Sequence, residues 1–406
     1  MSKTQVLFVD DEERLLSGLR RMLYDQRGEW EMYFCSSGAD AMEVIQNKAI
    51  DVIVSDMRMP GMNGAELLGK VQVASPSTTR FILSGYAELK TVIKTVGPSH
   101  QYIAKPCDPE NLKKSIHLTC SLKSDIRNIE LRTHIARISS LPISEQTIQS
   151  LAEIFVAKEP DLSAISSIAE SDACLAVQLL KLTNSSYFSI SPNISRIGEA
   201  VRFLGVEVLQ NLMQSENYLV GVNLPEDLHQ LFEDDLNTHH LRGRLAAKIC
   251  ETAGLAGTEV SLAFTAGLLS DIGTNIFLSY DAEKYSTLYA LLGDGVLNKE
   301  EAEKQIFNET SSAAGAYLLG LWGFTEKFIG TAISLKPTAE IDKAITPKTA
   351  VQIATAVIEA ARGERSGELN RQDEKMEMLL SSGCLTSENR VLYGKLLLEL
   401  TRNTAS

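Results

Sequence analysis

Four short apolar runs in the first part of the chain each lead into a polar group, and no other feature constrains the fold as tightly. The runs cover residues 6–9, 52–55, 81–83 and 102–104, and the polar groups that follow them are Asp10 with Asp11, Asp56, Ser84 and Lys105. Short apolar runs rich in β-branched residues are typical of buried strands. Because the carboxyl ends of parallel strands meet at one edge of an open sheet, the pattern predicts a single site built from these distant residues.

The stretches between the apolar runs have the periodicity of amphipathic helices. They cover residues 13–23, 39–45 and 64–73. Strand patterns that alternate with helical patterns indicate a parallel sheet covered by helices. A further strand is expected near residues 32–34.

Residues 109–138 have a helical pattern with one apolar stripe. The stripe contains Leu112, Ile116, Leu122, Ile126 and Ile129, and Thr119 interrupts it. Two interpretations fit this stripe: one helix packed on its own domain, or a connecting helix over residues 123–140 that forms a short dimeric coiled coil. The second interpretation raises the possibility of a homodimer. We expect the first domain to cover residues 1–122.

Helical periodicity continues from Leu141 to the end of the chain, and no strand-rich interval interrupts it. This predicts an all-α domain over residues 141–340. Residues 341–406 are expected to extend that domain, with amphipathic helices over 350–361 and 391–400.

Composition and charge exclude several classes of protein. The net charge is −13, which argues against a broad attraction to nucleic acid. No secretory signal is visible and no apolar run approaches the ~20 residues of a membrane span. The six cysteines are scattered, as expected for reduced thiols. A cytoplasmic protein that contacts neither membrane nor nucleic acid fits these features.

Asp10, Asp11 and Asp56 would meet at the edge of the predicted sheet. Three close carboxylates repel one another unless a cation compensates, and oxygen ligands suit Mg²⁺. A metal-neutralised carboxylate can also attack a phosphoryl group, whose oxygens Ser84 and Lys105 could contact. The alternatives are an exposed cluster of turn acids and, for Ser84, a simple turn hydroxyl.

Four motifs resemble the receiver domain of two-component response regulators. They are Phe8-Val-Asp-Asp-Glu12, Ser55-Asp-Met-Arg-Met-Pro-Gly-Met-Asn-Gly64, Leu83-Ser-Gly-Tyr86 and Tyr102-Ile-Ala-Lys-Pro106. Their joint order and spacing make the resemblance specific. It implies an α/β doubly wound, flavodoxin-like domain with a five-stranded parallel sheet.

The resemblance also implies the role of each residue. Asp56 would accept a phosphoryl group from a sensor histidine kinase. Mg²⁺ would be held by Asp10, Asp11, Asp56 and the backbone carbonyl of Arg58. Ser84 and Tyr102 would form the switch pair, and Lys105 would contact the phosphoryl group. For Tyr102, ordinary core packing is the alternative. In this family the positions of Arg58 and Tyr86 modulate water access, and because both side chains are bulky we expect slow self-dephosphorylation.

The helical region resembles the HDOD domain, an output module related to HD-type metal phosphohydrolases. The resemblance covers roughly residues 130–360, and Leu141-Pro142 is the first of its motifs. It is carried by Leu180-Lys-Leu-Thr-Asn-Ser-Ser-Tyr-Phe-Ser189, Ile197-Gly-Glu-Ala-Val-Arg-Phe-Leu-Gly205, Ala266-Gly-Leu-Leu-Ser-Asp-Ile-Gly273 and Gly315-Ala-Tyr-Leu-Leu-Gly-Leu-Trp-Gly323.

The metal chemistry of an HD hydrolase is missing from this sequence. Such enzymes need a His-Asp doublet with further His and Asp ligands. Here Ser270 and Asp271 stand at the doublet, and no histidine follows His240. We therefore expect a degenerate site, with Asp271 as a hydrogen-bonding residue and with His239 and His240 in packing or helix-surface positions.

Two further sets of residues in the helical region have an ordinary and a functional interpretation. Arg242, Arg244 and Lys248 are expected on a solvated helix face, with a phosphate-binding patch as the alternative. Trp322 and Phe324 are expected to fill the core, with nucleotide stacking as the alternative.

Taken together, the sequence predicts a phosphorylation-controlled response regulator. Its receiver would gate a non-catalytic helical domain that binds an unidentified downstream protein. The alternative is a receiver-controlled phosphodiesterase or phosphohydrolase that acts on a nucleotide or cyclic dinucleotide. A small-molecule sensor in the helical groove is a third interpretation.

Overall fold

The computed structural model describes residues 3–84, 98–157, 159–184, 196–214, 221, 224–293, 297–333, 344–366 and 393–396. Several predictions fall outside these residues. They concern Tyr86, most of the helix expected over residues 391–400 and the end of the motif that begins at Leu180.

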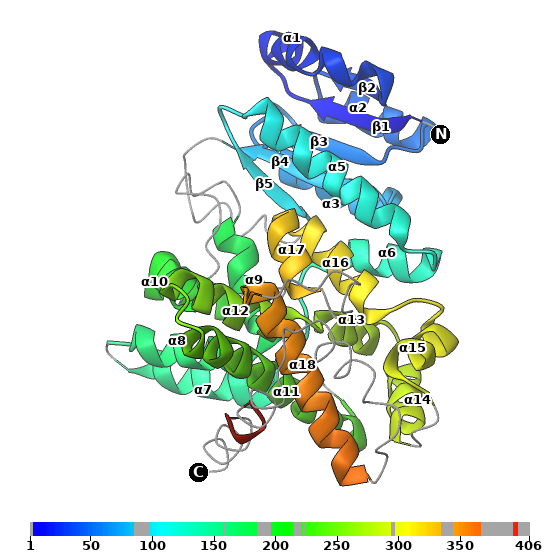
Figure 1. Cartoon of the computed structure of the whole chain (residues 1–406). Helices are drawn as coiled ribbons and strands as arrows, with labels where there is room; N and C mark the ends of the chain where they lie inside the picture. The colour runs from blue at the N-terminus through cyan, green and yellow to red at the C-terminus, as the bar shows by residue number, and fades with distance from the viewer. Residues whose placement is uncertain are drawn as a thin grey trace.

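The N-terminal part contains a five-stranded sheet in the order β2-β1-β3-β4-β5, and every neighbouring pair is parallel. Figure 1 shows it in blue and cyan at one end of the molecule. The strands are β1 Thr4–Val9, β2 Trp30–Cys35, β3 Val52–Asp56, β4 Thr79–Ser84 and β5 Gln101–Ala104. The expected parallel sheet and the strand near residues 32–34 are confirmed.

Helices cover both faces of this sheet. They are α1 Glu13–Met22, α2 Gly38–Asn47, α3 Gly64–Ala74 and α5 Pro109–Asp125, with a short 3₁₀ helix at Tyr24–Gly28. The hydrophobic cluster on one face includes side chains of α1 and α5, and the cluster on the other includes side chains of α2 and α3. This two-sided burial explains why the strands are apolar along their whole length. The doubly wound fold class is therefore confirmed.

Local sequence fixes where two of these helices begin. The side chain of Ser37 accepts a hydrogen bond from the backbone of Asp40, and that of Asn63 accepts one from Glu66. Gly64 follows at the first position of α3, where a Cβ atom would lie 2.1 Å from the carbonyl oxygen of Asp56. Only glycine therefore allows α3 to start so close to the end of β3.

The continuous connecting helix expected over residues 123–140 is wrong. Helix α5 ends at Asp125, and a separate helix α6 covers Ile129–Arg137. The side chain of Asn128 caps α6 by accepting a hydrogen bond from the backbone of Leu131. The break buries Ile126 and leaves Ile129 66% exposed, so the stripe is not a continuous seam for a coiled coil.

The rest of the described chain is helical, apart from an isolated bridge between Ile143 and Gly221. The helices are α7 Glu145–Val156, α8 Leu162–Ser171, α9 Ala173–Asn184, α10 Ile197–Met213, α11 Glu226–Thr252, α12 Gly257–Leu269, α13 Ile272–Tyr280, α14 Ala282–Gly293, α15 Lys299–Phe307, α16 Ser311–Leu321, α17 Glu326–Ala332 and α18 Pro347–Ser366. The all-α prediction is confirmed for these residues, and α18 contains the helix expected over 350–361.

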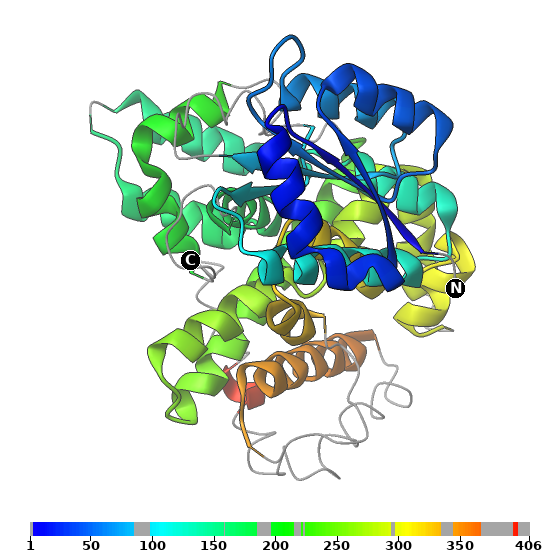
Figure 2. The same ribbon diagram turned by 90° about the horizontal axis from the view of Figure 1, so that it is seen from above.

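Close packing at two glycines holds the centre of the helical part together. Helix α11 is 27 residues long and crosses α12 where Gly243 meets Gly267. A Cβ atom on Gly243 would lie 2.7 Å from the carbonyl oxygen of Phe264. In Figure 2 the orange helix α18 lies to one side, away from the blue sheet.

One stretch of the described chain, Gly257–Tyr280, is long and apolar enough to cross a membrane. Within its most apolar window, 78% is buried inside the protein. It also consists of two helices, α12 and α13, that meet at Ser270 and Asp271. These features are those of core helices of a globular domain.

Candidate functional site

The carboxyl edge of the sheet brings two of the predicted acids together. Asp10 follows β1 and Asp56 ends β3, and they are only 1% and 7% exposed. The amino group of Lys105 lies 2.7 Å from Oδ2 of Asp10 and 2.5 Å from Oδ1 of Asp56. The two carboxylate oxygens therefore converge on one cationic position.

The remaining oxygen of each acid is held by the backbone. Oδ1 of Asp10 accepts a hydrogen bond of 2.9 Å from the amide of Glu12, and Oδ2 of Asp56 accepts one of 2.8 Å from the amide of Arg58. Burial alone would lower the pKa of Lys105, but its hydrogen bonds to Asp10 and Asp56 outweigh this effect and raise it. The pocket thus holds a protonated lysine between two fixed carboxylates.

This donor set fits a small divalent cation. Mg²⁺ binds through one or two carboxylates and keeps several waters, so two converging oxygens are sufficient. The third predicted acid, Asp11, is exposed. In the described part of the chain, no three His, Cys, Asp or Glu side chains gather in a way that could hold a metal.

The predicted switch residues lie on the two strands at the far side of the sheet. Ser84 ends β4 and pairs in register with Ala104, whereas Tyr102 pairs with Ile82. The ring of Tyr102 is 4% exposed and belongs to the hydrophobic cluster that continues into the helical part. The structure places the backbone of Ser84 at the pocket edge and describes nothing of its side chain.

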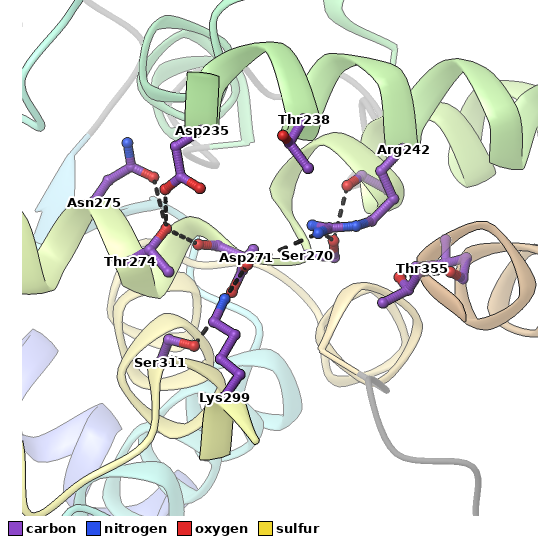
Figure 3. A network of polar contacts seen from close by, with 12 residues as sticks. Asp235, Thr238, Arg242, Ser270, Asp271, Thr274, Asn275, Lys299, Ser311 and Thr355 are labelled. Carbon is purple, nitrogen blue, oxygen red and sulfur yellow. Dashed lines mark hydrogen bonds and ion pairs between the residues drawn. The ribbon is translucent and has the colours of Figure 1, made fainter. Parts of the chain in front are cut away.

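A second charged network lies at the junction of α12 and α13 (Figure 3). Asp271 is 5% exposed and accepts hydrogen bonds from the amino group of Lys299 and, at 3.2 Å, from the hydroxyl of Ser311. A guanidinium nitrogen of Arg242 lies 3.8 Å from the same carboxylate. Burial would raise the pKa of Asp271, but the positive charges of Lys299 and Arg242 hold it well below its usual range.

The position expected to carry the histidine of the His-Asp doublet is used differently. The hydroxyl of Ser270 donates to the carbonyl of Gly267 at 2.8 Å and accepts from Arg242 at 2.9 Å. Arg242 is 5% exposed, so its expected place on a solvated helix face is wrong. Arg242 instead donates a hydrogen bond to Ser270 and forms an ion pair with Asp271.

The two histidines of α11 differ in environment. His239 is fully buried, neither ring nitrogen has a hydrogen-bond partner among the described residues, and burial lowers its pKa to about 4. His240 is partly buried, with Nδ1 2.8 Å from the carbonyl oxygen of Glu170. Both are packing residues, and His239 is not a helix-surface residue.

The sequence interpretation missed Lys299 and Asp235. Asp235 lies four residues before His239 and is held by the hydroxyls of Tyr289 at 2.6 Å and Tyr285 at 3.2 Å. The spacing of Asp235 and His239 on one helical face was a usable signal. Lys299 had none, because it comes from a helix far along the chain. Trp322 and Phe324 are 1% and 4% exposed, so their predicted core positions are confirmed.

Comparison with known families agrees with this division of the chain. Residues 6–117 match the response regulator receiver domain, and residues 141–334 match the HDOD domain. The two matched segments contain the acidic pocket and the network around Asp271, respectively.

The two curated relatives described next each match about a third of this chain. The hydrogenase transcriptional regulatory protein HoxA of Cupriavidus necator is 32% identical over 152 residues, which are 36% of this chain and 30% of that protein. The response regulator UvrY of Escherichia coli is 31% identical over 113 residues, which are 27% of this chain and 51% of that protein. The chain thus spans at most about half of these relatives.

Among solved structures, the MmoQ response regulator of Methylococcus capsulatus is 18% identical to this chain. The match covers 59% of this chain and 98% of that one, with a TM-score of 0.46.

Proposed function

We propose that this chain, which joins a receiver domain to an HDOD domain, is a phosphorylation-controlled response regulator whose helical domain works by protein binding. The domain limits expected from the sequence, 1–122 for the receiver and 141–340 for the HDOD domain, form part of the proposal. So do a cytoplasmic location and a sensor histidine kinase as partner.

Asp56 is the proposed phosphoacceptor. One of its oxygens is fixed by the amide of Arg58, and the other faces Lys105, so the side chain is oriented with a cation beside it. A carboxylate oxygen of Asp56 would form the bond to phosphorus as the bond from phosphorus to the nitrogen of the donor histidine breaks. Lys105 would then pair with an oxygen of the transferred group.

Asp10, Asp11, Asp56 and the carbonyl of Arg58 are the residues that would hold Mg²⁺. When bound, this cation would offset the negative charge that the carboxylates and the phosphoryl group bring together. The convergence of Asp10 and Asp56 on one cationic position supports this assignment. Phosphorylation adds about 1.5 to 2 negative charges at this point, and Ser84 and Tyr102 would respond to them.

The non-catalytic role of the helical domain is supported by one observation. Lys299 and Arg242 contact Asp271 where an HD hydrolase would use this carboxylate for a metal. A metal ion would have to displace two cations and would gain no imidazole from Ser270. A domain that keeps its fold but lacks this metal chemistry can still act by binding another protein through its surface.

Mass spectrometry with a small phosphodonor and Mg²⁺ tests the phosphoacceptor. We expect one labile phosphoryl adduct on the wild type, none on Asp56→Asn, and a normal adduct on Glu43→Gln, which changes an exposed acid on α2. Absence of an adduct on the wild type would refute the proposal.

The downstream role is tested by co-purification of wild type and Asp56→Asn from the native cell with and without phosphorylation. A protein partner whose recovery changes with the state of Asp56 is the expected result. The rival enzymatic function predicts tightly bound Fe, Mn or Zn and hydrolysis of a cyclic dinucleotide that is lost in Asp271→Ala. Such a result would replace protein binding with catalysis.

A further inference from the structure

The receiver and HDOD domains meet through a tight contact between α5, β5 and α16. The side-chain amide of Gln101 donates a hydrogen bond of 2.8 Å to the carbonyl oxygen of Gly320. A Cβ atom on Gly320 would lie 2.4 Å from a methyl group of Leu122 on α5. Figure 1 shows α5 and β5 directly above α16 and α17. Glycine at this position therefore sets how closely the two domains approach.

A second contact, beside the first, joins the domains through α6. The guanidinium of Arg80 donates to the carbonyl oxygen of Ala136 at 2.7 Å, and Nε2 of His100 lies 2.8 Å from the same oxygen. Arg80 is 1% exposed, and burial lowers its pKa to about 10. Its described partners are the imidazole of His100 and backbone carbonyls, and none is a carboxylate. The interface thus buries a cation without an opposite charge.

Polar groups near this interface remain unpaired. The hydroxyl of Tyr317 on α16 and the indole nitrogen of Trp322 are buried, and neither has a hydrogen-bond partner among the described residues. Tyr317 lies on the helix that contacts α5, so water would reach its hydroxyl if the domains separated, and its burial disfavours the closed arrangement. The interface is therefore less strongly held than a core in which every polar group is paired.

One short strand connects this interface with the acidic pocket. β5 begins at Gln101, which contacts Gly320, continues with Tyr102 and is followed by Lys105, which contacts Asp56. A strand rises about 3.3 Å per residue, so the two ends are only about 13 Å apart. A shift of β5 that follows from a change at Lys105 or Tyr102 acts directly on Gln101.

We propose that the contact between Gln101 and Gly320 is the coupling point through which the state of Asp56 controls the docking of the receiver on helix α16. The closed arrangement is the unphosphorylated form, and an anionic group on Asp56 opens it. This inference rests on the proposed function of Asp56. It adds the residues that transmit the signal and its direction.

Trp322 provides an optical probe of the interface. The chain has two tryptophans, Trp30 in the receiver core and Trp322 next to Gly323, whose own Cβ position lies 3.5 Å from the side chain of Gln101. In Trp30→Phe, Trp322 is the single remaining tryptophan, so all tryptophan emission comes from the residue next to Gly323 at this interface. Beryllofluoride with Mg²⁺ serves as a reversible analogue of the phosphoryl group. We expect it to shift the emission to longer wavelength and to increase the radius of gyration in small-angle X-ray scattering.

Linkage gives a sharper test, because coupling between two equilibria is reciprocal. If the analogue favours the open form, substitutions that open the interface must tighten analogue binding by the same coupling. We expect Gly320→Leu and Gln101→Leu to lower the Kd of beryllofluoride by about fivefold or more, within the usual range of allosteric coupling. Gly330→Leu on α17 is the matched control, because a Cβ atom there meets nothing within 4 Å.

The results separate the two proposals. If wild type gains no phosphoryl adduct on residue 56, the proposed function of that residue is wrong. If the adduct forms but neither emission nor radius changes, the coupling is wrong. It is also wrong if Gln101→Leu or Gly320→Leu opens the interface, as judged by Trp322, while the Kd of beryllofluoride equals that of Gly330→Leu. Gln101→Leu removes the hydrogen bond to Gly320 without adding atoms to the side chain, so this comparison does not depend on the folding of Gly320→Leu.

Discussion

The receiver and the HDOD domain each place a lysine on a buried aspartate, but the two sites balance charge differently. In the receiver, Asp10 and Asp56 face the single amino group of Lys105, with Asp11 nearby in sequence. In the HDOD domain, Asp271 faces both Lys299 and Arg242, and Glu303 faces Lys299 as well. The first site has an excess of negative charge that a metal can offset, and the second has matching cations of its own.

A buried carboxylate paired with a lysine therefore leaves one site with excess negative charge and the other with its charge compensated. Negative excess at a partly open sheet edge is an arrangement that responds to added cations and phosphoryl groups. In the HDOD domain, Asp271 with its two cations joins helices α11, α13, α15 and α16. Predictions that perturb individual lysines test this difference.

Lys181 differs from both Lys105 and Lys299, because this buried lysine has no carboxylate among its described partners. Its amino group contacts the carbonyl of Ser139 and lies 4.4 Å from the centre of the Trp322 ring, and burial lowers its pKa to about 7. Between pH 7 and 10.5 the unfolded chain binds a proton there that the folded chain lacks, so stability rises with pH.

Lys181→Met should remove this rise, which we put on the order of 3 kcal/mol across the window. Urea unfolding at several pH values measures it. Lys48→Met, at an exposed lysine, should keep the pH dependence of wild type. Equal slopes for wild type and Lys181→Met would show that Lys181 is charged in the folded protein.

Lys299→Ala tests whether the pairing of Lys299 with Asp271 stabilises the fold. It leaves Asp271 with Arg242 alone, and we expect a loss of about 2 kcal/mol, below the ~3–5 kcal/mol for a fully buried pair because Lys299 is partly exposed. The free energy of unfolding in urea provides the measurement. The control is Lys304→Ala, which breaks the exposed pair with Glu300 and should cost at most about 1 kcal/mol. Equal losses for the two variants would contradict a structural role for Lys299.

Lys105→Met tests the excess of negative charge at Asp10 and Asp56. Because Lys105 competes with a metal for Asp10 and Asp56, its removal should tighten Mg²⁺ binding by about tenfold, the effect of one nearby charge in a partly exposed site. Calorimetric titration measures the affinity. Lys113→Met, whose lysine pairs with Asp25 away from the pocket, should bind Mg²⁺ like wild type. Weaker binding by Lys105→Met would mean that the lysine supports the metal site.

The smallest expected effect concerns the lifetime of the phosphoryl group. The bulky side chains of Arg58 and Tyr86 should slow the entry of water, and we therefore predict slow decay of the adduct. Arg58→Ser should accelerate decay severalfold, as followed by loss of the adduct mass over time. A half-life of seconds in the wild type would contradict this expectation.

The receiver could be predicted well from sequence because its signals are local. Each strand is a short apolar run, and each polar group directly follows its strand, so the parallel arrangement alone brings Asp10, Asp56 and Lys105 together. The convergence of two acids on one lysine confirms the expected gathering. The expected participation of Asp11 and Ser84 stays a prediction, since Asp11 is exposed and the side chain of Ser84 is outside the described residues.

The helical domain could be predicted only in outline. Its helices follow from periodicity, and the serine at residue 270, where the resemblance expects a histidine, is read directly. The burial of Arg242 was not predictable, because helical spacing gives one face of a helix but does not say what packs against it. The break between α5 and α6 was also missed, since the cap at Asn128 is only one residue in a favourable helical stretch.

Sequence by itself determined the class of each domain, the order of the strands' polar residues and the absence of histidine at the doublet. Tertiary structure alone decided that Lys299 pairs with Asp271 and that Gln101 donates a hydrogen bond to Gly320. It also decided that Leu122 packs against Gly320, where a larger residue would clash. The physical reason is range: apolar periodicity and turn chemistry act over a few neighbouring residues, whereas charge pairing and close packing join residues that folding alone brings together.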